Sequence, residues 1–172
     1  MSTPVSTRCR NVLFLCTGNS ARSILAEAIM NHIGAGRLRA FSAGSQPTGK
    51  VNPYALQLLE RMKIPAPDAR SKSWDEFSGT GAPQMDFVFT VCGNAAGETC
   101  PVWPGHPITA HWGVEDPAAV TGDELAKINA FRAAFNVLEH RIRIFASLPL
   151  ATLDNISLAH QVRAIGSALP GA

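Results

Sequence analysis

The strongest constraint on the fold is a short apolar segment over residues 11–16 that runs into a turn and then into a helical pattern. The run Asn-Val-Leu-Phe-Leu-Cys is typical of a strand that is buried on both faces. Apolar residues then recur at helical spacing as Ile24, Leu25, Ala28, Ile29 and Ile33. Gly34 and Gly36 suit the end of that helix. The pattern therefore predicts a strand, a loop and a helix in immediate succession.

The remainder of the chain repeats this alternation of strands and helices. Further strands are expected over residues 37–42, 86–91 and 107–111. Further helices are expected over residues 54–63, 73–76, from 121 onward and over about 152–169. N-cap signals precede three of them: Asn52-Pro53, and the capping boxes Ser73 to Glu76 and Thr121 to Glu124.

Alternating strands and helices indicate βαβ units, so we expect an α/β fold with a four-stranded, mostly parallel sheet flanked by helices. The sequence contains no repeat and no linker long enough to divide it. We expect a polar N-terminal tail over residues 1–10 and a single domain over residues 11–172 that ends in an extra C-terminal helix.

Composition excludes several classes of function. Of 172 residues, 46% are hydrophobic and 16% are charged, and the net charge is only +2, so neither a disordered chain nor a nucleic-acid binder with a basic face is expected. No apolar run approaches the roughly 20 residues that span a bilayer, and no targeting segment is visible. Four cysteines are too few for a disulfide scaffold, so a cytoplasmic protein with reduced thiols is expected.

The loop between the first strand and the first helix has the composition of an oxyanion site. Backbone N–H groups and the helix dipole converge at such a place, and Arg22 adds a planar fork for two oxygens. The same field is expected to lower the pKa of Cys16 and make it a nucleophile. The expected oxyanion ligands are Thr17, Gly18, Asn19, Ser20, Ala21, Arg22 and Ser23. The alternative is that Cys16 is a buried strand-end residue and Arg22 an exposed helix residue.

Two further cysteines frame a loop rich in Gly and Ala. Cys92 ends the third expected strand, and Cys100 follows eight positions later. A mobile loop with two thiols is what a disulfide cascade requires, because exchange needs one sulfur to approach another directly. Two alternatives stay open: the thiols are packing residues, or Cys92, Cys100, His106 and His111 bind zinc. Without zinc, His111 is expected to be partly buried beside Trp112.

The segment from Cys16 to Ser23, after its apolar strand, resembles the nucleophile loop of low-molecular-weight protein tyrosine phosphatases. Ser42-Ala43-Gly44 and Asp116-Pro117 also resemble that superfamily. The cysteine pair and the segment His111-Trp112-Gly113 before Asp-Pro resemble the arsenate reductases built on the same fold. Two differences are the Ala21 position, where that family often has a second cysteine, and the longer spacing between Cys92 and Cys100.

The resemblance implies a thiol-based reduction of arsenate to arsenite for arsenic detoxification. Cys16 would attack arsenic, Asp116 would protonate the leaving oxygen, and Cys92 and Cys100 would pass the disulfide on. Phosphate and sulfate would compete as oxyanions, and thioredoxin, or glutaredoxin with glutathione, would supply electrons. No metal or flavin cofactor is needed for this chemistry.

Two other functions remain in competition. The first is a phosphatase for phosphotyrosine or small phosphate esters, but Ala118-Ala119 follows Asp116-Pro117 where those enzymes carry tyrosines. The second is a non-catalytic module that binds an oxyanion or zinc. Some members of this fold also bind a monovalent cation beneath the loop; Asn19 and Ser42 match part of that site, and Lys72 is a candidate to replace the ion.

Overall fold

The computed structural model describes residues 8–93 and 103–168. Its four strands form one sheet in the order β2-β1-β3-β4, and every neighbouring pair is parallel. The strands are β1 (Arg10–Leu15), β2 (Leu38–Ala43), β3 (Phe87–Thr90) and β4 (Ile108–His111). The expectation of a four-stranded, mostly parallel sheet is therefore confirmed, and β1 begins at Arg10, inside the span expected to be a tail.

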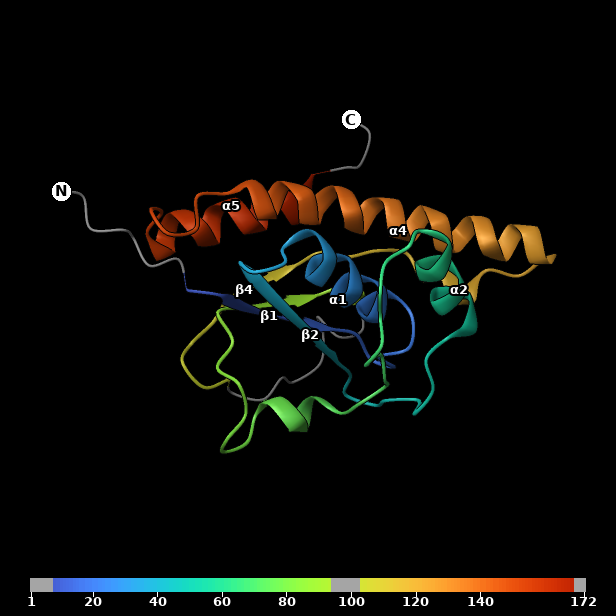
Figure 1. Cartoon of the computed structure of the whole chain (residues 1–172), viewed down its shortest axis with the longest axis horizontal. Coiled ribbons are helices and arrows are strands. Elements are labelled where there is room, and N and C mark those ends of the chain that lie inside the picture. Colours follow the sequence, from blue (N-terminus) through green and yellow to red (C-terminus); the bar gives the residue numbers. More distant parts are fainter. Residues whose placement is uncertain (1–7, 94–102, 169–172) are drawn as a thin grey trace.

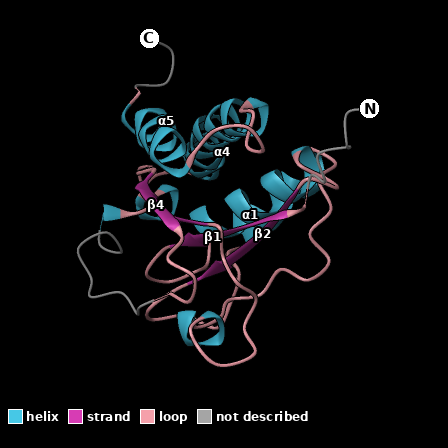
Figure 2. Ribbon diagram, turned by 90° about the vertical axis from the view of Figure 1, so that its left-hand side faces the viewer, coloured by secondary structure: helices cyan, strands magenta, loops and turns pink. Residues whose placement is uncertain are grey.

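The long helices lie together on one face of this sheet, as Figures 1 and 2 show. They are α1 (Arg22–Ile33), α2 (Pro53–Arg61), α4 (Glu124–Ser147) and α5 (Asn155–Ser167). The other face is covered in part by the 3₁₀ helix η1 (Trp74–Phe77), green at the bottom of Figure 1. A second 3₁₀ helix, η2 (Pro117–Ala119), precedes α4.

Strand β1 is buried on both faces, as its continuous apolar run predicts. Val12 and Phe14 belong to the large core beneath the helices, whereas Leu13 and Leu15 belong to the smaller core on the opposite face. All four side chains are at most 1% exposed. A strand in this position holds the residue that follows it, Cys16, at the centre of the carboxyl edge of the sheet.

Two helix starts differ from the capping boxes that the sequence suggests. The N-cap of α4 is Asp123, whose carboxylate accepts from the N–H of Ala126, and not Thr121. At η1, Ser73 does cap, but Glu76 forms an ion pair with Arg70 and does not close the box. A carboxylate is a stronger acceptor than a hydroxyl, and a nearby arginine outcompetes a backbone N–H, so charged neighbours in the same segments decided both sites.

The expected C-terminal helix is present as α5, with Asp154 as its N-cap. It buries Leu158, Val162 and Ile165 against the domain, whereas Ile156 is 84% exposed. Within the described residues, no helix is both long enough and apolar enough to cross a membrane.

Candidate active site

The nucleophile loop, residues 16–22, connects β1 to α1 at the carboxyl edge of the sheet. Cys16 is held by its N–H, which donates to the carbonyl of Ala43 at the end of β2. Gly44 lies so close to the loop that a Cβ there would stand 2.4 Å from the carbonyl oxygen of Thr17. Only glycine fits at this position, which explains the glycine that directly follows β2.

The carbonyl groups of the loop are turned outward and bonded to the surrounding chain. Those of Thr17, Gly18 and Ser20 accept from the N–H groups of Gln46, Thr48 and Asn52, respectively. In contrast, no N–H group from residue 18 to residue 22 has an acceptor among the described residues. A loop with satisfied carbonyls and free N–H groups is arranged to receive an anion.

The N-terminus of α1 adds to this field. Its N-cap, Ala21, offers no side-chain hydrogen bond, and the first turn contains no acidic residue. Helices usually satisfy these N–H groups with Ser, Thr, Asp or Asn. Because the residue at this cap is alanine, the positive end of the helix dipole stays available to a ligand.

Asn19 fixes the shape of the loop from within. It is fully buried and has a left-handed backbone with φ of 46°, which asparagine tolerates better than most residues. Its Nδ2 donates to the Oγ of Ser23 at 2.8 Å, and its Oδ1 accepts from the N–H of Lys72 at 2.9 Å. Ser71 also donates its hydroxyl to the carbonyl of Gly18. The hydroxyl of Ser23, one of the expected oxyanion ligands, therefore accepts from Asn19.

A charged cluster lies beneath the loop, formed by Ser42, Glu27 and Lys72. Ser42 donates its hydroxyl to Glu27 at 2.9 Å, and the Lys72 ammonium lies 3.5 Å from the same hydroxyl and 3.0 Å from the carbonyl of Arg70. Burial raises the pKa of Glu27 and lowers that of Lys72, while each charge opposes the shift of the other. The ammonium of Lys72 thus supplies a positive charge at the place considered for a monovalent cation.

Arg22 and Asp116 are brought together across the mouth of the loop. The Nη2 atom of Arg22 lies 3.6 Å from an Asp116 carboxylate oxygen, and its Nη1 donates to the carbonyl of Val114 at 2.8 Å. Asp116 also caps η2 by accepting from the N–H of Ala118. The guanidinium is largely buried and the carboxylate half-exposed, so the arginine is held in place and the acid faces solvent.

Cys92 lies against Cys16, and this contact overturns one expectation. The hydrogen bond between the two thiols, followed by burial, raises the pKa of Cys16 well above its usual range, and the nearby charge of Arg22 only partly opposes this. The N–H of Thr17 points at the Cys92 sulfur at 3.4 Å. The expected lowering of the Cys16 pKa is therefore wrong for this arrangement, because the Cys92 thiol, which does not belong to the loop, forms a hydrogen bond with Cys16.

The remaining thiols are Cys9 and Cys100, and the zinc alternative also involves His106 and His111. Cys100 lies outside the described residues, and Cys9 is an exposed free thiol. The ring of His111 is exposed, not partly buried as expected, and its Nδ1 lies 2.7 Å from the hydroxyl of Thr90. Over residues 8–93 and 103–168, no group of three or more His, Cys, Asp or Glu side chains could hold a metal ion.

A pocket of about 360 Å³ adjoins the site on the side of Asp116. Its wall includes Pro117, which follows the expected acid, and Asn52, which is bonded to the loop at Ser20. Two aromatic rings, Tyr54 and Phe131, also line it, with centroids 5.5 Å apart. This pocket thus contains aromatic rings from α2 and α4, of which Phe131 is only 2% exposed.

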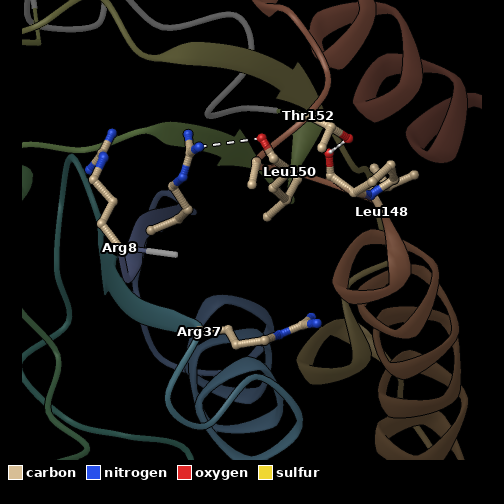
Figure 3. A pocket seen from close by; sticks show the side chains of 8 residues that line it. Arg8, Arg37, Leu148, Leu150 and Thr152 are labelled. Atoms are coloured by element: carbon tan, nitrogen blue, oxygen red, sulfur yellow. Dashed lines mark hydrogen bonds between the residues drawn. The ribbon is translucent and has the colours of Figure 1, made fainter. Parts of the chain in front are cut away.

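Another cavity, of about 220 Å³, lies at the opposite end of the sheet (Figure 3). Arg8, Arg10 and Arg37 surround it, together with the connection between α4 and α5 over residues 148–152. Arg8 pairs with Asp86, and the other two arginines donate to backbone carbonyls. This cavity is remote from the nucleophile loop because the loop leaves the other end of β1.

Sequence reasoning missed two parts of the site. Glu27 was not singled out, although it interrupts an otherwise apolar stretch of α1. Arg141 was also missed; it is buried on α4 and donates to the carbonyl of Gly113 at 2.9 Å. A charged residue on the buried face of a helix was the available signal in both cases.

Comparison with known proteins agrees with this geometry. The family model for low molecular weight phosphotyrosine protein phosphatase matches residues 11–157. An arsenate reductase of Oceanobacillus iheyensis is 36% identical over 78% of this chain and 94% of its own length, and one of Bacillus subtilis is 33% identical over the same shares.

Solved structures give the same result. The structure of an arsenate reductase from Archaeoglobus fulgidus is 26% identical, with a TM-score of 0.63 over 80% of this chain and 99% of that one. A low molecular weight protein tyrosine phosphatase from T. tengcongensis, 23% identical, shares the fold with a TM-score of 0.62 over 78% of this chain and 95% of that one. The chain therefore belongs to the low molecular weight phosphotyrosine protein phosphatase family, within its arsenate reductase branch.

Proposed function

We propose that this protein reduces arsenate to arsenite by nucleophilic attack of Cys16 and transfer of a disulfide to Cys92 and Cys100. The observation that carries the proposal is the nucleophile loop itself. Its N–H groups from residue 18 to residue 22 have no acceptor in the described part of the chain, the N-cap Ala21 of the helix makes no side-chain cap hydrogen bond there, and two thiols meet beside the loop. A phosphatase needs only one of those thiols, whereas a reductase needs both.

In the first step, arsenate binds in the loop and displaces Cys92 from Cys16. The free N–H groups of residues 18–22 and the guanidinium of Arg22 bind its oxygens. With Cys92 withdrawn, the largest cause of the raised Cys16 pKa is gone and the charge of Arg22 favours the thiolate. The thiolate attacks arsenic, an As–O bond breaks, and Asp116 gives its proton to the departing oxygen as water.

In the second step, Cys92 attacks the sulfur of the Cys16–arsenate adduct. The S–As bond breaks and its electron pair goes to arsenic, which changes from As(V) to As(III) and leaves as arsenite. The two sulfurs form a disulfide, so the thiols are oxidised by two electrons. The contact between Cys16 and Cys92 supports this step, since the attack needs the two sulfurs side by side.

In the third step, Cys100 attacks Cys92 and frees Cys16, and a reductant opens the resulting Cys92–Cys100 disulfide. The relay at Cys100 is proposed from the sequence alone, since that residue lies outside the described part. Thioredoxin is the proposed reductant, with glutaredoxin and glutathione as the alternative; a structural neighbour from Corynebacterium glutamicum, 24% identical, is titled thioredoxin-dependent. Such coupling requires a reducing compartment, so a cytoplasmic location is proposed.

Arsenate-dependent oxidation of NADPH tests the proposal. The purified protein is assayed with thioredoxin and its reductase, and in parallel with glutaredoxin, glutathione and glutathione reductase. We expect turnover with the thioredoxin system, no turnover for Cys16→Ser, and loss of multiple turnover for Cys92→Ser. Repeated turnover by Cys92→Ser would disprove the relay. Absence of turnover in every system, with phosphate still bound, would favour the non-catalytic module.

A second candidate activity, phosphate-ester hydrolysis, is favoured by the aromatic pocket beside Asp116. Hydrolysis needs Cys16, Arg22 and Asp116 but not Cys92. Cleavage of p-nitrophenyl phosphate and of a phosphotyrosine peptide should therefore be compared in the wild type and in Cys92→Ser. The two rates to compare are peptide hydrolysis by Cys92→Ser and arsenate reduction by the wild type. If the hydrolysis is faster, phosphatase activity is the main function.

A further inference from the structure

The C-terminal helix α5 lies against the strand that leads to Asp116. It packs on β4, and its Arg163 donates Nε to the carbonyl of Thr109 at 3.2 Å. The approach is closest at Gly166, where a Cβ would stand 2.2 Å from the carbonyl oxygen of His111. The helix thus contacts the last residues before the segment 113–116.

Trp112 is the link between α5 and that segment. Its side chain is fully buried, and its indole N–H donates to the carbonyl of Val162 in α5 at 2.9 Å. The ring stacks on Phe89 of β3, with centroids 4.1 Å apart and planes 16° apart. The backbone of Trp112 donates to Thr90 at 2.7 Å. The tryptophan is therefore fixed between the sheet and α5.

The residues after Trp112 are held by backbone contacts that reach the nucleophile loop. The carbonyl of Gly113 accepts from Arg141 of α4, and that of Val114 accepts from Arg22 of α1. The N–H of Val114 donates to Val91 at 3.0 Å. Two residues later, Asp116 stands beside Arg22. The position of the acid and one contact of the oxyanion-binding arginine thus depend on how the chain leaves Trp112.

We propose that α5 is a positioning element of the active site and that Trp112 is the positioning residue through which it acts. By holding the indole, α5 sets the path of residues 113–116, so that Val114 orients Arg22 and Asp116 faces the loop. The inference rests on the proposed function, because Arg22 and Asp116 have catalytic roles only within it. Small misplacements of such groups lower rates strongly even when binding persists.

Trp112→Phe is the first probe, because it keeps an aromatic ring in the core while it removes the indole N–H together with part of the ring system. The carbonyl of Val162 keeps its helical partner, so the fold is preserved. We expect single-turnover arsenite formation to slow by about tenfold. Trp74→Phe, on the other face of the sheet, is the matched control and should leave the rate unchanged. Arg163→Gln, which removes only the contact with Thr109, should slow it in the same direction but less.

Double-mutant cycles with Asp116→Asn and with Arg22→Lys separate positioning from general stability. If Trp112 acts through Asp116, Trp112→Phe lowers the rate of single-turnover arsenite formation in the wild type and lowers it little or not at all in Asp116→Asn. Equal losses in the wild type, in Asp116→Asn and in Arg22→Lys, or no loss in any of them, would overturn the inference while wild-type turnover still supported the proposed function. A wild type without arsenate turnover would instead remove the proposed function itself. Thermal unfolding of each variant confirms that folded proteins are compared.

Discussion

Arginine side chains lie at both ends of the sheet, one at the nucleophile loop and three at the opposite end, but in opposite electrostatic settings. At the carboxyl end, Arg22 stands at the uncapped N-terminus of α1, beside N–H groups that have no acceptor among the described residues. At the amino end, Arg37 donates to the carbonyl of Ala146 in the last turn of α4, and Arg10 donates to the carbonyl of Leu150 (Figure 3). At the carboxyl end, the guanidinium of Arg22 is added to backbone N–H groups that are also hydrogen-bond donors. At the amino end, the guanidinium groups are paired with carbonyl acceptors.

The comparison shows that cavity size and arginine count do not by themselves identify an anion site. The amino-end cavity holds three arginines, yet Asp86 and the carboxyl end of a helix satisfy them. Cations at a helix C-terminus stabilise the fold by offsetting its dipole. The loop at the other end has one arginine, and its free backbone N–H groups make it the better ligand for a tetrahedral anion.

The largest expected effect comes from removing the arginine of the first setting. Arg22→Ala should lower kcat/KM for arsenate by about a thousandfold, as for loss of a donor to a developing oxyanion. Arg22→Lys should recover only part of this, because an ammonium cannot bind two oxygens in one plane. Steady-state kinetics with the thioredoxin system measures both. A loss below tenfold for Arg22→Ala would show that the backbone N–H groups suffice.

The second effect concerns the buried charge that supports the loop. Lys72→Ala leaves Glu27 buried without its compensating charge and should lower the free energy of unfolding by about 3 kcal/mol. Urea denaturation measures this loss. The charge-removing pair Lys72→Met with Glu27→Gln should lose less than Lys72→Ala alone. If Lys72 substitutes for a monovalent cation, potassium should stabilise Lys72→Ala more than the wild type at equal ionic strength.

The third effect concerns the thiol contact at the centre of the loop. Cys92→Ala removes the largest cause of the raised Cys16 pKa, so that pKa should fall. Below the pKa, each unit of decrease gives about ten times more thiolate, and alkylation of Cys16 by iodoacetamide should quicken accordingly. Its pH profile should move to lower pH in Cys92→Ala, with Cys9→Ser introduced in both proteins to remove background. An unchanged profile would show that burial alone controls this thiol.

The smallest effect tests the amino-end cavity. Arg37→Ala removes a hydrogen bond to the end of α4 and should lower the free energy of unfolding by about 1 kcal/mol without changing arsenate turnover. Phosphate should raise the melting temperature of this variant as much as that of the wild type, but should fail to do so for Arg22→Ala. If phosphate no longer raises the melting temperature of Arg37→Ala, the anion binds in the cavity at the amino end of the sheet and not at the nucleophile loop.

Local sequence signals were sufficient where a single segment determined the outcome. The apolar run before Cys16 predicted the doubly buried strand, and the spacing after it predicted α1. The fold class and the gathering of Cys16, Arg22, Asp116 and Cys92 followed from this pattern and from the family resemblance.

Signals failed where the outcome depended on a side chain outside the motif considered. The capping boxes failed for a local reason, since Asp123, two residues after Thr121, caps α4, and Arg70, six residues before Glu76, binds its carboxylate. The Cys16 pKa was expected to fall because the loop was considered alone, whereas Cys92, distant in sequence, raises it. Spacing along one segment carries no information on which distant side chain fills a site.

The contact between Cys16 and Cys92 also affects how the Cys16 thiol resists irreversible oxidation. Peroxides oxidise thiolates, and a thiol kept protonated is a poor target. The same contact that raises the Cys16 pKa therefore shields the nucleophile in the resting protein. Should Cys16 be oxidised to a sulfenic acid, its neighbour can condense with it to a reducible disulfide before irreversible damage follows. The thiol pair that is proposed to reduce arsenate would thus also protect the enzyme against oxidation by peroxides.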